Sequence, residues 1–174
     1  NTIVVSASKY EKKLSEETVS IEVVGSELLE NNNIVDAEES LRKVPGVSIV
    51  DGQANIRGGS GWAYGAGSRV LVLYDDIPLL SADAGDAKWS LVPMENLETV
   101  EVIKGAASSI YGSGALNGVV NFRTGYPSLT PETKLNVWMT AMHAPRNKEE
   151  AWWYGNNALP FSNGMNFCLL YTSP

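Results

Sequence analysis

The sequence predicts an α+β domain of short strands and short helices, followed by a separate strand-forming segment. Residues 99–103 alternate as a strand, residues 119–121 form a second strand, and the two enclose a glycine-rich turn. Between residues 34 and 44, apolar side chains recur at helical spacing. After residue 124 the composition changes, and an alternating segment begins at residue 133. These three observations predict a first domain that mixes strands with helices and a second, strand-only part.

The first elements in chain order are a strand at 20–24 and a short helical turn that opens at 25–27. We expect the next helix to be capped by Asn33, with Asp36 in the capping-box position. Pro45 and Gly46 end that helix. Its apolar stripe consists of Ile34, Ala37, Leu41 and Val44.

The N-terminal segment is β-prone, and a charged stretch follows it at residues 9–17. Such a segment is either an edge strand or a peptide that another protein binds by strand addition. The pattern leaves both open. The residues concerned are Thr2, Ile3, Val4, Val5, Ser6 and Ala7.

Two long loops follow the middle strands, which we expect at 47–50, 55–58 and 69–74. The loop at 58–67 is rich in glycine and carries Trp62 and Tyr64, and aromatic side chains in such loops often contact ligands. The loop at 79–89 carries Asp83 and Asp86, whose spacing matches no calcium-binding loop. The turn between 105 and 118 contains Gly105, Gly112 and Gly118, where the backbone needs conformations or close contacts that a β-carbon would prevent.

Composition and motifs argue against several classes of function. The net charge of −7 disfavours nucleic-acid binding, and Cys168 and His143 are the only residues of their types. A catalytic triad, a histidine-based metal site and an internal disulfide are therefore poorly supported. The glycine loops fit neither a dinucleotide fingerprint nor a P-loop, and we predict no enzyme, no metal and no cofactor. No apolar run is long enough for a transmembrane helix.

The segment at 133–142 alternates between apolar and polar residues over about ten positions, which is typical of one strand of a transmembrane barrel and of any amphipathic strand. Gly125, Pro127 and Pro131 mark the boundary before it. The final residues, 168–174, resemble a translated sequencing adapter and are interpreted as not native to the protein.

Five ordered motifs resemble the plug domain of TonB-dependent outer-membrane receptors. They are Leu-x-x-x-Pro-Gly-Val at 41–47, Ile-Arg-Gly at 56–58, the strand Val-Leu-Val-Leu-Tyr-Asp at 70–75, Val-Glu-x-x-x-Gly at 100–105, and the block from Tyr111 to Asn121. Two positions depart from the family pattern: Asp76 and Asn117 stand where the family usually has glycine. The resemblance covers residues 2–123.

The resemblance implies a plug with a small mixed sheet, followed by the start of a truncated transmembrane β-barrel. It divides the chain into a TonB box and linker (1–17), the plug (18–124), a linker (125–132) and the start of the barrel (133–174). Residues 2–7 would be the TonB box, which binds a periplasmic TonB-type energy-transducing protein. Arg57 and Lys104, with Glu101 as a third candidate, would contact the barrel wall. The loops would face the ligand through Trp62, Tyr64, Ser81, Asp83 and Trp89, and the structural turn glycines would be Gly58, Gly105, Gly112 and Gly118.

The function implied is uptake across the outer membrane of a Gram-negative cell. The ligand would be a small molecule such as a metal chelate (a siderophore complex), a cobalamin-like cofactor or an oligosaccharide, and the chain is most similar to the cobalamin-receptor branch. A free-standing, soluble plug-like binding module is the alternative.

Overall fold

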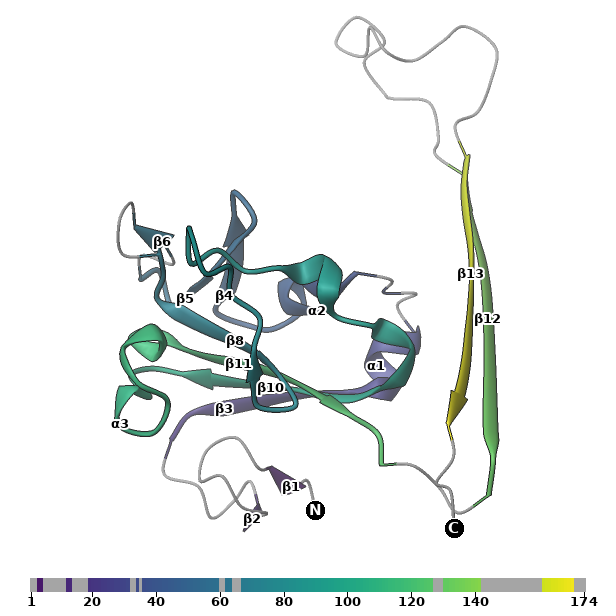
Figure 1. Cartoon of the computed structure of the whole chain (residues 1–174), viewed down its shortest axis with the longest axis horizontal. Coiled ribbons are helices and arrows are strands. Elements are labelled where there is room, and N and C mark those ends of the chain that lie inside the picture. The colour runs from purple at the N-terminus through teal and green to yellow at the C-terminus, as the bar shows by residue number, and fades with distance from the viewer. Residues whose placement is uncertain are drawn as a thin grey trace, which may run out of the picture. The chain divides into compact units, whose positions relative to one another are not determined.

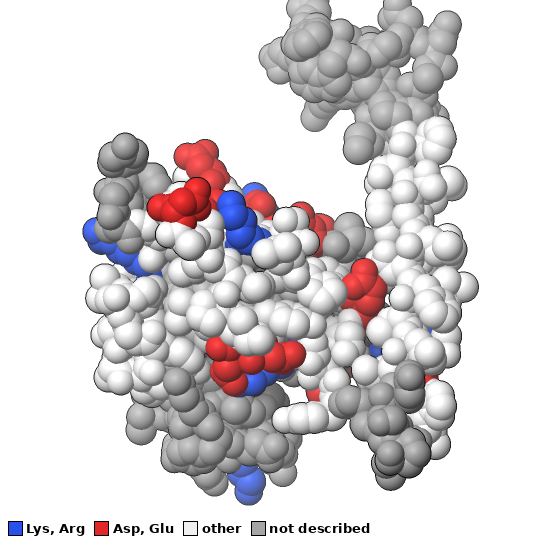
Figure 2. All heavy atoms as spheres, in the orientation of Figure 1, with Lys and Arg blue, Asp and Glu red and all other residues white. Residues whose placement is uncertain are grey.

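The computed structural model describes residues 3–4, 12–13, 19–31, 34, 36–59, 62–63, 67–126, 130–141 and 161–170. The chain divides into two compact units, Asn1–Tyr126 and Pro127–Pro174, which are described separately. Acidic side chains form several separate groups on the face shown in Figure 2, with basic side chains beside some of them. No continuous basic surface appears on this face.

A five-stranded sheet forms the centre of the first unit (Figure 1). Its strand order is β3-β10-β11-β8-β9, in which β11 and β8 are parallel and all other neighbours are antiparallel. The prediction of a small mixed sheet is therefore confirmed. The strands are β3 (Ile21–Gly25), β8 (Val70–Tyr74), β9 (Ile77–Pro78), β10 (Leu97–Lys104) and β11 (Gly118–Thr124).

The two strands that enclose the glycine-rich turn are neighbours inside this sheet. β10 and β11 pair from Thr99↔Arg123 to Lys104↔Gly118, with a bulge between Leu97 and Thr99. Alternate residues face opposite sides of a strand, and here both sides are buried. These interior strands therefore consist largely of β-branched and aliphatic residues, as expected of strands covered on both faces.

Each face of the sheet has its own apolar cluster. The larger cluster joins Val72, Val102 and Phe122 to helices α1 (Ser26–Asn31) and α2 (Ala37–Arg42), which lie on one side of the sheet in Figure 1. The smaller cluster joins Leu73, Ile103 and Val119 to the turn between β10 and β11. That turn contains α3 (Ser108–Tyr111) and the 3-10 helix η4 (Ser113–Ala115).

Helix α2 begins three residues later than the sequence suggests. The expected cap at Asn33 is wrong: Asp36 is the N-cap, and its carboxylate accepts a hydrogen bond of 2.9 Å from the amide of Glu38. Ile34 lies between α1 and α2, and its amide donates to the carbonyl of Leu29 in α1 at 3.1 Å. The predicted apolar stripe is confirmed, because its members are all buried: Ile34, Ala37, Leu41 and Val44.

Short paired strands and 3-10 helices connect these elements. The β4–β5 hairpin turns at Asp51 and Gly52, whose φ values of +49° and +71° are those of a primed hairpin turn. The remaining elements are β1 (Ile3–Val4), β2 (Lys12–Lys13), β4 (Val47–Val50), β5 (Gln53–Ile56), β6 (Trp62–Ala63), β7 (Gly67–Ser68), η2 (Trp89–Leu91) and η3 (Met94–Asn96).

The second unit contains an antiparallel strand pair, β12 (Glu132–Ala141) and β13 (Phe161–Leu170). Leu135 lies opposite Phe167 and Val137 opposite Met165, so one face of the pair is apolar and exposed. Residues 168–170, which the sequence analysis set apart, pair with 132–134 as the end of β13. Residues 171–174 lie outside the described residues.

Candidate functional site

The loop at 79–89 is closed by its own backbone. Leu80 and Ala87 form an antiparallel bridge, and the amide of Lys88 donates to the carbonyl of Leu79 at 3.0 Å. Farther out, the amide of Ser81 donates to the carbonyl of Asp86 at 2.9 Å, and the amide of Gly85 donates to the carbonyl of Ser81 at 3.0 Å. Residues 81–86 are therefore a hydrogen-bonded turn with a two-stranded base.

The side chain of Asp86 is bonded to two neighbouring residues of the loop at 79–89, Ser81 and Lys88. The hydroxyl of Ser81 donates to Asp86 Oδ1, and Lys88 Nζ lies 2.8 Å from Asp86 Oδ2. The hydrogen bond from Lys88, followed by that from Ser81, lowers the pKa of Asp86. The amide of Ala84, followed by the amide of Asp83 itself, lowers the pKa of the exposed Asp83 carboxyl. The hydrogen bond to Asp86 raises the pKa of Lys88.

These shifts predict how the 81–86 turn responds to pH. Carboxyl groups whose pKa is lowered by folding stabilise the turn above their usual value of 3.8, and this contribution disappears as the pH falls through the lowered value. Lys88 acts in the opposite sense, so its contribution is present below 10.5 and is lost as the pH rises through the raised value. We expect the amide NMR shifts of residues 81–86 to stay constant between about pH 5 and 9. A titration midpoint above 3.8 for either carboxyl group would contradict the lowered pKa values of Asp83 and Asp86.

The side chain of Trp89 anchors the end of this loop to the body of the domain. Its indole Nε1 donates to the carbonyl of Gly52 at 2.6 Å. Its ring also packs edge-on against Phe122, with the ring centroids 6.5 Å apart and an interplanar angle of 78°. Trp89 is half-buried, and its polar edge is used inside the domain.

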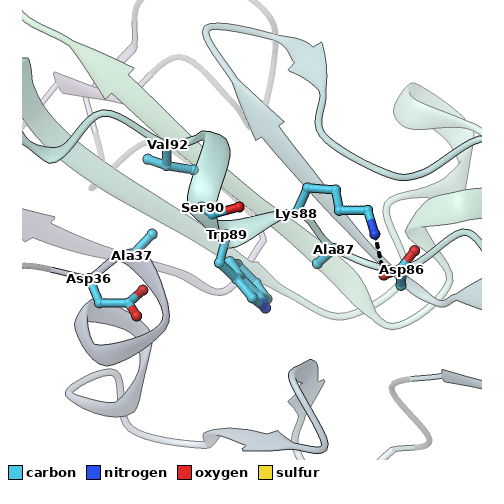
Figure 3. A pocket seen from close by; sticks show the side chains of 8 residues that line it. All are labelled: Asp36, Ala37, Asp86, Ala87, Lys88, Trp89, Ser90 and Val92. Carbon is cyan, nitrogen blue, oxygen red and sulfur yellow. Dashed lines mark hydrogen bonds and ion pairs between the residues drawn. The ribbon is translucent and has the colours of Figure 1, made fainter.

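A hollow of about 580 Å³ lies beside the loop, between its last residues and the start of α2 (Figure 3). Figure 3 shows the ammonium of Lys88 directed to Asp86, and Asp36 on the opposite wall. The Asp36 carboxylate is already engaged as the cap of α2. The hollow thus has mixed polar and apolar walls, and its full lining is Asp36, Ala37, Asp86, Ala87, Lys88, Trp89, Ser90 and Val92.

Two of the predicted contact residues meet where β3 begins. Arg57 donates from Nη2 to the hydroxyl of Ser20 at 2.8 Å, and its guanidinium is exposed. The amide of Lys104 donates to the carbonyl of Ser20 at 2.8 Å. The ammonium of Lys104 bonds to Glu22 at 3.1 Å and to the carbonyl of Pro45 at 2.7 Å, and only 9% of this side chain is exposed.

Glu101, the third predicted contact residue, lies in the middle of the sheet. It is 2% exposed, and its register partners are Asn121 on β11 and Val23 on β3. The structure therefore brings Arg57 and Lys104 together and keeps Glu101 inside the sheet, away from the surface.

The four turn glycines have positive φ values, as expected from the sequence. They are +70° at Gly58, +134° at Gly105, +81° at Gly112 and +152° at Gly118. Only Gly118 is also enclosed: a Cβ there would lie 2.3 Å from the carbonyl oxygen of Ile103 and 2.7 Å from Ile56 Cδ1. At Gly58, Gly105 and Gly112 nothing lies within 4 Å of such a Cβ.

Part of the predicted N-terminal site and of the first loop lies outside the described residues. Within the N-terminal segment the structure describes only β1, which pairs with Lys12 and Lys13 of β2. In the first loop the backbone of Trp62 pairs with Ser68. The predicted site residues outside the description are Thr2, Val5, Ser6, Ala7 and Tyr64.

The sequence analysis did not assign a role to the turn after β8. Asp75 accepts from the amide and the hydroxyl of Thr124, at 3.0 and 2.6 Å. Asp76 binds both terminal nitrogens of Arg123, at 2.9 and 3.1 Å. Asp76 has a φ of +66°, which explains why a glycine is usual there. In the sequence, the one indication of the contact between Asp76 and Arg123 is that an aspartate stands where the family usually has glycine.

Among the described residues, no group of three or more His, Cys, Asp or Glu side chains is placed to hold a metal ion. In the same part of the chain, no helix is long and apolar enough to cross a membrane.

Comparison with known proteins identifies the fold. The family model "TonB-dependent Receptor Plug Domain" matches residues 13–119, which is more than half of the chain. The chain belongs to this family. The predicted α+β plug is thereby confirmed, and so is the prediction that the chain is not an enzyme, because TonB-dependent receptors are transporters.

Two relatives illustrate the similarity of this plug to known receptors. It is 35% identical over 130 residues to the vitamin B12 transporter BtuB of Vibrio vulnificus, covering 71% of this chain and 20% of that protein. The crystal structure of the siderophore receptor PirA from Pseudomonas aeruginosa matches with a TM-score of 0.56 and 27% identity, over 77% of this chain and 23% of that one. The chain thus spans about one fifth of the length of the transporters it matches. Members of the family sit in the outer membrane.

Proposed function

We propose that this plug belongs to an outer-membrane transporter that takes up vitamin B12 or a related corrinoid. The observation that carries the proposal is the similarity to vitamin B12 transporters, which reaches 35% identity and extends over 71% of the chain. Siderophore receptors share the fold at lower identity, such as 27% for PirA. A metal chelate or an oligosaccharide is therefore the less favoured ligand class.

In this proposal the plug, residues 18–124, closes the lumen of a barrel of about 22 strands. The strand pair β12–β13 supplies the first barrel strands, since one of its faces is apolar and exposed, as a lipid-facing surface requires. Residues 1–17 form the TonB box and its linker on the periplasmic side, and 125–132 link the plug to the barrel. The extracellular ligand contacts the loops at 58–67 and 79–89.

A periplasmic TonB-type protein pairs with residues 2–7 by strand addition and pulls on the plug. The pull reaches the folded domain at Ser20, just before β3, where Arg57 and Lys104 hold the backbone and the hydroxyl. Arg57 has the exposed cation that a contact with a barrel carboxylate requires. To contact a barrel carboxylate, Lys104 would have to give up its ion pair with Glu22. Glu101 is buried in the sheet, so it would contact the barrel only if the side of the sheet that covers it opened.

Uptake of cyanocobalamin by cells tests the proposal. We expect the complete receptor that contains this chain to restore energy-dependent uptake of labelled cyanocobalamin in a Gram-negative strain without its own vitamin B12 transporter. The same receptor should bind cyanocobalamin in isolated outer membranes. Uptake of a ferric siderophore in place of cyanocobalamin would contradict the ligand assignment. Binding by a soluble plug with no membrane-bound receptor would favour the free-standing module.

A further inference from the structure

The two candidate ligand loops touch each other through two glycines. A Cβ on Gly67 would lie 3.1 Å from the Cα of Gly85, and a Cβ on Gly85 would lie 3.0 Å from the Cα of Gly67. Both residues have positive φ, +69° and +61°. The amide of Ser68 donates to the carbonyl of Gly85 at 2.8 Å. A Cβ at either glycine would be closer to backbone than most Cβ atoms are, so the two segments would have to move apart by a few tenths of an ångström.

A third segment, the turn of the β4–β5 hairpin, is bonded to the same place. The amide of Ala87 donates to Gln53 Oε1 at 3.4 Å, and the indole of Trp89 donates to the carbonyl of Gly52 at 2.6 Å. Three segments that are distant in sequence are therefore joined within a few residues. We call them the loop junction: Gly52, Gln53, Gly67, Ser68, Gly85, Ala87 and Trp89.

The loop junction connects the 81–86 turn to residues that lie outside the loop at 79–89. The turn closes on itself through Ser81 and Asp86, and its base is bonded to the sheet where the amide of Leu79 donates to the carbonyl of Val72 at 2.8 Å. The crossing at Gly85 and the bonds from Ala87 and Trp89 add contacts from the loop at 58–67 and from the β4–β5 hairpin. They act on both sides of Asp86, so the exposed Asp83 carboxylate at the tip of the turn is carried on a supported base.

We infer that the loop junction preorganises the ligand-facing surface of the plug, with Gly67 and Gly85 as positioning residues for ligand capture. This inference rests on the proposed function, in which the two loops face the extracellular ligand. A binding surface that is already ordered loses less conformational entropy when the ligand arrives, so the affinity is higher for the same contacts. A side chain at either glycine separates the segments and removes this advantage without removing any group that touches the ligand.

The test compares Gly85→Ala with Gly46→Ala in the complete receptor. Gly46 has a similar φ of +77°, and nothing lies within 4 Å of a Cβ placed there, so G46A carries the backbone strain without the collision. In G85A we expect the Ser68 and Ala87 amides to exchange with solvent at least about tenfold faster, and cyanocobalamin to bind about tenfold more weakly. In G46A both quantities should stay within about twofold of the unmodified receptor.

A milder variant covers the case in which G85A fails to fold. Trp89→Phe keeps the ring and removes the donor to Gly52, and we expect a smaller change in the same direction in both measurements. Faster exchange at the junction with unchanged affinity in G85A or W89F would overturn the positioning role. Unchanged exchange in both would show that the junction does not hold the turn. If the unmodified receptor does not bind cyanocobalamin, the proposed function fails, and the exchange data alone then support or overturn the junction as an ordered unit.

Discussion

Replacing Gly118 with alanine is expected to lower the free energy of unfolding of the plug by about 3–5 kcal/mol. The new Cβ would lie 2.3 Å from the carbonyl oxygen of Ile103, which is main chain on the neighbouring strand and has no rotamer to change. Gly118 opens β11, pairs with Lys104 and continues directly into Val119 and Val120 of the core. Because small domains are stable by only about 5–15 kcal/mol, this loss removes a large part of the total.

Urea denaturation of this chain and of the variant measures the effect. Gly25→Ala is the matched control, because Gly25 also lies in a strand beside β10, and nothing is found within 4 Å of a Cβ there. We expect G25A to change the stability by less than about 1 kcal/mol. Gly112→Ala should fall between the two, because Gly112 has a φ of +81° but open space around it. Equal stability of G118A and G25A would refute the close packing of this turn.

Deleting residues 2–7 from the complete receptor is expected to abolish uptake of cyanocobalamin and to leave its binding unchanged. Strand addition depends on main-chain hydrogen bonds from an extended peptide, and the deletion removes that peptide. The candidate ligand loops begin at residue 58 and are joined to each other through Gly67 and Gly85, and the deletion leaves this contact in place. Uptake should fall to the level of cells that lack the receptor.

A pair of point variants separates strand addition from other effects of the deletion. Val4→Pro removes one main-chain donor, whereas Val4→Ala keeps it, so uptake should fall sharply only in V4P. Radiolabelled cyanocobalamin measures uptake in cells and binding in isolated outer membranes. If the deletion also abolishes binding, residues 2–7 are a structural strand of the receptor and not a segment offered to a partner.

Local pattern was enough to find most secondary structure in the first unit. The alternation at 99–103 and the helical spacing from Ile34 to Val44 each predict an element that the structure contains, because both patterns arise from burial of one face. The start of α2 was missed because Asn33 and Asp36 are both good capping residues, and pattern alone does not rank them. The Asp76 contact with Arg123 was also missed, since the two residues are far apart in sequence and meet only when β8 and β11 align.

Taken alone, the sequence determined the fold family, the class of element at most positions and the glycine-rich turn at Gly118. The fold family followed from the resemblance of five ordered motifs to known plug domains. The element classes and the turn depend on residue type and on spacing over a few positions, which local backbone geometry governs. The tertiary structure alone decided which residues meet. It paired β11 with β8, buried Glu101 in the sheet, placed Lys104 beside Glu22, and brought Gly67 against Gly85. Such contacts follow from how the whole core packs, and packing is a sum over residues that are distant in the chain.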